Sequence, residues 1–174
     1  MNIPALISGS IAIIVFSWFY SIKRKRYHGI PRFFAFESIY ILILLNLSRW
    51  LSDPFSWNQL ISWVLLILSA VFGLAGYFTL KNKGKATGDF ENTTVLVKSG
   101  VYGMIRHPLY FSLLLLGTGV MMKNLSPPSV AAGVANLIAL GFTAATEEKE
   151  MMVKFGKKYH DYIKETKMFI PFIL

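Results

Sequence analysis

The segment Val95–Tyr110 concentrates the side chains of this chain that are best suited to chemistry. It reads VLVKSGVYGMIRHPLY and holds a Ser-Gly turn, a second glycine, two tyrosines and an Arg-His-Pro run. Pro108 disfavours helical angles at the residue before it and suits the first turn of a helix. Arg106 and His107 are therefore predicted to lie on a bent entry to that helix. This position indicates a candidate site, although a simple basic anchor beside an apolar segment predicts the same pattern.

Two apolar segments follow the Arg-His-Pro run and lead to an acidic pair. Pro108–Met122 and Ser129–Thr146 are joined by the turn-forming residues Lys123–Pro128. They are predicted to form an antiparallel helical hairpin, with a re-entrant pair as the alternative. The hairpin would return Glu147 and Glu148 to the end at which it started.

The hairpin thus predicts a cluster of Arg106, His107, Tyr102 and Tyr110 with the two glutamates. Two interpretations stay open at this point. The first is a salt bridge between Arg106 and Glu147 that pins the hairpin, since a charge at the membrane face is costly without a partner. The second is a pocket for a charged polar small molecule, lined in part by the backbone of Val95–Val97.

The composition places this cluster in a membrane protein. Of the 174 residues 54% are hydrophobic, and the mean hydropathy is +0.50, too apolar for a soluble domain of this size. There is no cysteine, and the three histidines lack a metal-binding spacing, so we expect no metal site. The net charge of +9 is divided among three loops, which fits a lipid bilayer as partner rather than nucleic acid.

Three further apolar segments precede the motif: Ile3–Ile22, Phe33–Leu51 and Trp57–Leu80. A helix of about 20 residues is about 30 Å long, enough to cross the hydrocarbon core. Glu37 is expected near one end of the second span, where its side chain can reach the interface; facing the bundle is the alternative.

The last segment, Glu147–Lys167, is predicted to be an amphipathic helix with its acidic residues first and its lysines last. Gly156 either weakens this helix or breaks it. The apolar face is formed by Met151, Phe155, Tyr159 and Tyr162.

The predicted fold class is all-α: a polytopic membrane protein of about five transmembrane helices with a C-terminal amphipathic cytoplasmic helix. We expect a single domain, with three spans in residues 1–80 and the loop, hairpin and C-terminal helix in residues 81–174. Sixteen of the 18 basic residues fall on one side of this arrangement. The positive-inside rule then places the N-terminus outside, and the C-terminus and the candidate site in the cytoplasm.

The motifs resemble the isoprenylcysteine carboxyl methyltransferase family, and phospholipid N-methyltransferases share the broader pattern. The resemblance consists of S-G-V-Y-x-x-I-R-H-P-L-Y from Ser99 to Tyr110, the hairpin, E-E-x-x-M-x-x-x-F-G-x-x-Y-x-x-Y from Glu147 to Tyr162, and Pro171. It covers about Thr94–Phe172, and the first three spans match only as generic helices.

The resemblance implies an integral membrane methyltransferase that uses S-adenosyl-L-methionine (SAM), releases S-adenosyl-L-homocysteine and methylates a hydrophobic or prenylated acceptor. It implies the following cofactor-binding residues: Thr94, Val95, Leu96, Val97, Tyr102, His107, Pro108, Leu109, Tyr110 and Glu147. One departure is Thr143, where eukaryotic members carry a substrate-binding arginine.

We assign Arg106, His107 and Glu148 as candidate catalytic residues, with Arg106 orienting a carboxylate. A carboxylate is ionised at pH 7 and needs no general base, whereas an amine must first lose a proton. Carboxyl O-methylation is therefore favoured, and N-methylation of a phospholipid or another amine is the alternative. A non-enzymatic transporter or scaffold predicts charges near the middle of a span, and the sequence places them at the ends.

Overall fold

The computed structural model describes residues 3–21, 23, 26–87 and 91–170. Within these ranges the regular structure is helical, apart from one isolated bridge between Ile105 and Lys167. The all-α prediction is confirmed. The elements are α1 (Ile3–Tyr20), α2 (Gly29–Asn46), η2 (Leu47–Arg49), α3 (Trp57–Lys83), η3 (Gly100–Gly103), α4 (Pro108–Met122), α5 (Pro127–Phe155) and α6 (Lys157–Glu165).

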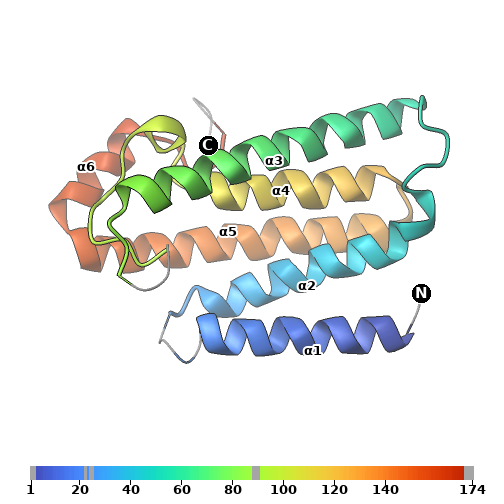
Figure 1. Ribbon diagram of the computed structural model, residues 1–174, viewed down its shortest axis with the longest axis horizontal. Helices are drawn as coiled ribbons and strands as arrows, with labels where there is room; N and C mark the ends of the chain where they lie inside the picture. The colour runs from blue at the N-terminus through green and yellow to red at the C-terminus, as the bar shows by residue number, and fades with distance from the viewer. Residues whose placement is uncertain (1–2, 22, 24–25, 88–90, 171–174) are drawn as a thin grey trace.

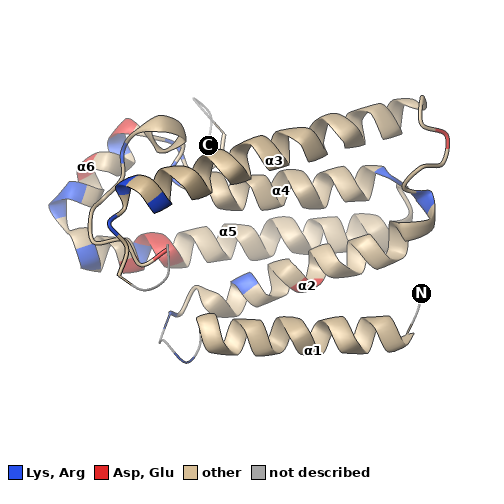
Figure 2. Cartoon of the chain, in the orientation of Figure 1, with Lys and Arg blue, Asp and Glu red and all other residues tan. Residues whose placement is uncertain are grey.

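The five long helices lie side by side in the order α1, α2, α5, α4, α3 (Figure 1). The α3–α4 connection, η3 and α6 form a cap over one end of this bundle. Most charged residues lie at this capped end, and few lie at the other (Figure 2). Four helices are long and apolar enough to cross a membrane, namely α1, α2 with η2, α3 and α5. The chain is therefore an integral membrane protein.

The hairpin of α4 and α5 runs the length of the bundle. Helix α4 begins at Pro108 and ends at Met122, as predicted, and its 15 residues span about 22 Å. Beyond its end, Lys123 donates a hydrogen bond of 2.9 Å to Gln59, near the start of α3. Since α4 joins the capped end to the opposite end, the structure favours a crossing hairpin over a re-entrant pair.

Small residues on α3 bring α4 close to it. A Cβ atom at Gly76 would lie 3.1 Å from Cδ2 of Leu109, which is tighter than ordinary packing. Ser69 also donates a hydrogen bond of 2.7 Å to the carbonyl of Ser112. Close approach between helices is what small residues allow in a bilayer, and here it fixes the position of α4.

The predicted helix boundary at Glu147 is wrong. Helix α5 continues through both glutamates to Phe155, and only then does the chain break, at Gly156. Residues 147–155 are mostly Glu, Lys and Met, which are good helix formers and give no stop signal. Gly156 has φ +53°, a value that favours glycine. The amphipathic helix is therefore the shorter α6.

The second span also differs, because α2 begins at Gly29, four residues before the expected start. Pro31 is tolerated there, in the first turn of the helix. The shift places Glu37 in the middle of α2, where its Oε1 accepts a hydrogen bond from Ser10 of α1. The expected interface position of Glu37 is thus wrong, and its side chain contacts a neighbouring helix of the bundle, as the alternative predicted. Ile22 and the segment from Pro171 onward lie outside the described residues.

Candidate functional site

The Arg-His-Pro bend is held in place by the C-terminal segment. The backbone N–H of Arg106 donates to the carbonyl of Lys167 at 2.8 Å, and that of His107 to the carbonyl of Met168 at 3.2 Å. His107 has the non-helical angles φ −123° and ψ 60°, and α4 starts at the next residue. The bend predicted from Pro108 is confirmed, and these two backbone hydrogen bonds fix its direction.

Arg106 joins this bend to α5. Its Nε donates to Oε1 of Glu148 at 2.6 Å, and its side chain is only 8% exposed. Its Nη1 donates to the carbonyls of Ile163 and Thr166, beyond α5 in the chain. A salt bridge therefore holds the two ends of the hairpin together, as the first of the two interpretations predicted. The acidic partner of Arg106 in this salt bridge is Glu148 and not Glu147. The predicted Arg106–Glu147 pair is wrong.

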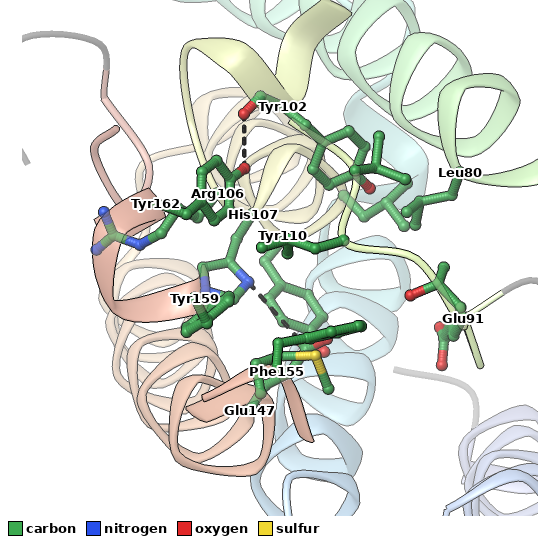
Figure 3. A pocket seen from close by; sticks show the side chains of 15 residues that line it. Leu80, Glu91, Tyr102, Arg106, His107, Tyr110, Glu147, Phe155, Tyr159 and Tyr162 are labelled. Atoms are coloured by element: carbon green, nitrogen blue, oxygen red, sulfur yellow. Dashed lines mark hydrogen bonds and ion pairs between the residues drawn. The ribbon is translucent and has the colours of Figure 1, made fainter. Parts of the chain in front are cut away.

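His107 lies between the two carboxylates of α5. Its Nε2 is 3.3 Å from Oε1 of Glu148, and its Nδ1 is 3.7 Å from Oε2 of Glu147. Its ring stacks on Tyr110, with 5.5 Å between the centroids and 17° between the planes. The imidazole is thereby fixed on three sides, and Figure 3 shows it pointing toward Glu147.

These side chains surround a pocket beneath the cap (Figure 3). It measures about 660 Å³ out to its open mouth, of which about 80 Å³ can be reached by the centre of a water molecule. Both of the earlier interpretations are thus realised together, since the pinned hairpin forms the wall of a pocket. The lining residues are Leu80, Glu91, Thr93, Leu96, Val97, Tyr102, Arg106, His107, Leu109, Tyr110, Glu147, Met151, Phe155, Tyr159 and Tyr162.

Most of the residues assigned from the sequence line this pocket, and four do not. Thr94 and Val95 are exposed, and both of their N–H groups donate to the carbonyl of Gly84. Pro108 is buried on the side facing α3. Glu148 lies behind His107 and contacts Arg106. Those that line the pocket are Leu96, Val97, Tyr102, Arg106, His107, Leu109, Tyr110 and Glu147.

Several lining residues were not assigned from the sequence. Met151, Phe155, Tyr159 and Tyr162 belong to the recognised apolar face, whose spacing could have indicated that it covers the site. Glu91 gave no signal, because its partner Arg32 lies 59 residues away and no spacing rule links them.

The pocket keeps its tyrosine hydroxyl groups neutral. Burial, together with the nearby Glu147 carboxylate, raises the pKa of Tyr102 well above its usual value. Burial, with Glu148 and then Glu147, does the same to the pKa of Tyr159. The hydroxyl of Tyr162 donates to the carbonyl of Tyr102 at 2.6 Å, which ties α6 to η3. These phenols are therefore hydrogen-bond donors and aromatic walls, and not bases.

Fold and site together define a polytopic membrane protein with a polar, aromatic-lined pocket at one end of its helical bundle. The family model of phospholipid methyltransferases matches residues 57–158. The chain belongs to this family.

Curated relatives carry a more specific name. The chain is 32% identical over 144 residues to the human protein-S-isoprenylcysteine O-methyltransferase and 33% identical over 144 residues to the mouse protein. Each match covers 73% of this chain and 50% of the relative, so the chain spans about half the length of these proteins. The rat protein of the same name is 37% identical over 87 residues, 48% of this chain and 30% of the relative. No solved structure matches the chain significantly.

Proposed function

We propose that this chain is a SAM-dependent methyltransferase that methylates the carboxylate of a lipophilic, isoprenylcysteine-like acceptor at the membrane face. The observation that carries the proposal is the pocket in which the Arg-His-Pro bend and Glu147 converge, in a chain of this family. The names of its relatives support the same acceptor class.

The residues around the pocket fit SAM as a ligand. SAM carries a sulfonium and an ammonium group, both positive, beside an aromatic adenine. Glu147 supplies a carboxylate for hydrogen bonds to the ammonium or a hydroxyl group, and aromatic faces attract cations and stack on bases. Tyr102, Tyr110, Tyr159 and Phe155 supply such faces.

The groups of the chain are assigned separate roles. When bound, SAM supplies a methyl group activated by the sulfonium charge, with neutral S-adenosyl-L-homocysteine left as the second product. Glu147 and His107 bind and orient the ligand, and Leu96, Val97 and Leu109 exclude water from it. Arg106 and Glu148 hold His107 and the bend in place, so we assign them as positioning residues.

The proposed orientation places the pocket on the cytoplasmic side and the start of α1 outside. Figure 2 shows that most of the charged residues lie at the capped end. Because SAM is made in the cytoplasm, a pocket on that side has direct access to it. The positive-inside rule supports the same direction.

Methyl transfer from radiolabelled SAM to N-acetyl-S-farnesylcysteine by the reconstituted full chain tests this function. We expect label in the lipophilic product and its release by alkali, because base cleaves methyl esters. Absence of transfer to any lipophilic carboxylate would contradict the proposal.

An amine acceptor is the second candidate, because the matching family is described as phospholipid methyltransferases. In the same assay, vesicles of phosphatidylethanolamine replace the carboxylate acceptor. Transfer of the labelled methyl group to this lipid, in a form that alkali does not release, would favour N-methylation.

A further inference from the structure

A second hollow adjoins the candidate cofactor pocket. It lies between the α1–α2 connection and the last turns of α5, and the centre of a water molecule can reach about 670 Å³ of it, against about 80 Å³ of the pocket. Glu91, Glu147 and Met151 line both hollows. A ligand in one would therefore meet a ligand in the other at these three residues, which is the arrangement that group transfer between two molecules needs.

The wall that the two hollows share carries the carboxylates of Glu91 and Glu147, which repel an acidic acceptor. Like charges repel each other strongly where the effective dielectric constant is low. An acceptor carboxylate placed beside Glu91 and Glu147 therefore needs a cation of its own. Arg106 lines the pocket, but it is bonded to Glu148 and to two main-chain carbonyls that hold the C-terminal segment. In the second hollow, Arg26 is bonded to Glu91, and Lys149 and Lys154 are exposed to solvent, where a charge binds a carboxylate weakly.

Arg32, near the start of α2, already holds a carboxylate at this wall. Its Nη1 donates to both carboxylate oxygens of Glu91 at 2.9 Å, and its Nη2 donates to Ser21 at 2.7 Å. The residue is 4% exposed and lines neither hollow, but it contacts Glu91, which lines both. The guanidinium of Arg32 is thus positioned to bind a carboxylate where the two hollows meet.

We propose that Arg32 is the binding residue for the acceptor carboxylate, and that Glu91 occupies its guanidinium until the acceptor displaces it. This inference rests on the proposed carboxyl methylation. The exchange replaces one carboxylate by another on the same guanidinium, so Arg32 stays paired. Glu91 also keeps a partner, because Nη1 of Arg26 donates to its Oε2 at 3.1 Å. The acceptor tail remains in the bilayer beside α2, and its head group lies in the second hollow.

The test uses the reconstituted full chain with N-acetyl-S-farnesylcysteine as the acid probe and its uncharged carboxamide as a competitive inhibitor. In Glu91→Gln the competing charge is gone, so we expect the KM for the acid to fall at least threefold while the inhibition constant of the carboxamide stays within twofold. In Arg32→Gln we expect the KM for the acid to rise at least tenfold and the inhibition constant of the carboxamide to stay within twofold.

Matched controls lie away from the hollows. Glu165→Gln changes an exposed acid of α6, and Arg49→Lys changes an exposed arginine at the other end of the bundle. Both variants should leave the KM for the acid and the inhibition constant of the carboxamide unchanged. If Arg32→Gln does not fold, Arg32→Lys keeps the charge but loses the planar fork, and the KM for the acid should rise at least threefold.

The outcomes separate this inference from the proposed function. A higher KM for the acid in Glu91→Gln, or equal effects on acid and carboxamide in the Arg32 variants, would show that the pair only supports the fold. Methyl transfer without dependence on Arg32 and Glu91 would overturn the inference alone. An acid preference in equilibrium binding that depends on Arg32, without any methyl transfer, would overturn the proposed function alone.

Discussion

The two ends of the bundle each bury a cation, and they do so differently. At the end away from the cap, Lys123 is 2% exposed, and its Nζ lies 3.6 Å from the ring centroid of Trp63 and 5.4 Å from that of Trp50. Its hydrogen bond to Gln59 completes this enclosure. At the capped end, the Arg106 side chain is 8% exposed, and it lines a pocket whose other walls carry Glu147 and His107.

The difference shows that burial of a charge does not by itself mark a site. Lys123 joins the α4–α5 turn to the start of α3, and its neighbours are two indole rings and an amide. Around the Arg106 bend, a carboxylate, an imidazole and several aromatic rings face one hollow. The comparison predicts that substitutions at the Lys123 end alter stability alone. Substitutions at the capped end should alter both stability and the binding of SAM.

The largest effect on stability is expected for Arg106→Ala. Removing the guanidinium leaves Glu148 as a poorly compensated, partly buried charge and frees the carbonyls of Ile163 and Thr166. The free energy of unfolding in mixed micelles should fall by about 3–5 kcal/mol. The double variant Arg106→Met with Glu148→Leu should recover part of this loss. Lys98, which forms an exposed ion pair with Glu165, is the control. If Arg106→Ala lowers the free energy of unfolding no more than Lys98→Ala does, Arg106 does not hold the hairpin together.

A smaller effect is expected for Lys123→Met. The variant loses the contacts to both indole rings and leaves the Gln59 amide oxygen without its donor, so stability should fall by about 1–2 kcal/mol. The Kd for SAM should stay within twofold of the wild-type value, as measured by calorimetry. A tenfold weaker Kd in a folded variant would remove the proposed distinction between the two ends.

The smallest effect is expected for Gly100→Ala, in the turn that leads to the bend. Gly100 has φ +63°, and an added Cβ would lie 3.4 Å from Oγ1 of Thr79, an ordinary contact. The cost is therefore one of backbone strain alone, about 1 kcal/mol. Gly141→Ala is the matched control, because that glycine is helical and has nothing within 4 Å of the added atom. Equal melting temperatures for the two variants would contradict this account of the turn.

The sequence predicted the elements whose ends carry local signals. Pro108 and the turn after Met122 indicated both ends of α4, and the two apolar segments joined by that turn predicted the hairpin. The end of α5 was misplaced because the change from apolar to charged residues at Glu147 was taken as the end of the helix. Helix-forming residues continue past that point to Phe155. Glu37 was misplaced for a related reason, since α2 starts earlier than its apolar run.

Pairings in the site were harder to predict than its members. The sequence brought Arg106, His107 and the two glutamates to one end, but it could not decide which glutamate faces the guanidinium. That choice depends on the rotation of α5, which packing against α2 and α4 sets. Glu91 and Arg32 lie on a loop and a helix far apart in the chain, and their contact exists only in the folded bundle.

Calorimetric titration of the purified full chain with SAM tests the central claim most directly. We expect saturable binding by the wild type and binding about thirtyfold weaker in Glu147→Gln, which corresponds to about 2 kcal/mol for a charge-assisted hydrogen bond. Glu165→Gln, on the exposed face of α6, should bind as the wild type does. Wild-type affinity in a folded Glu147→Gln protein would contradict the assignment of this pocket to the methyl donor.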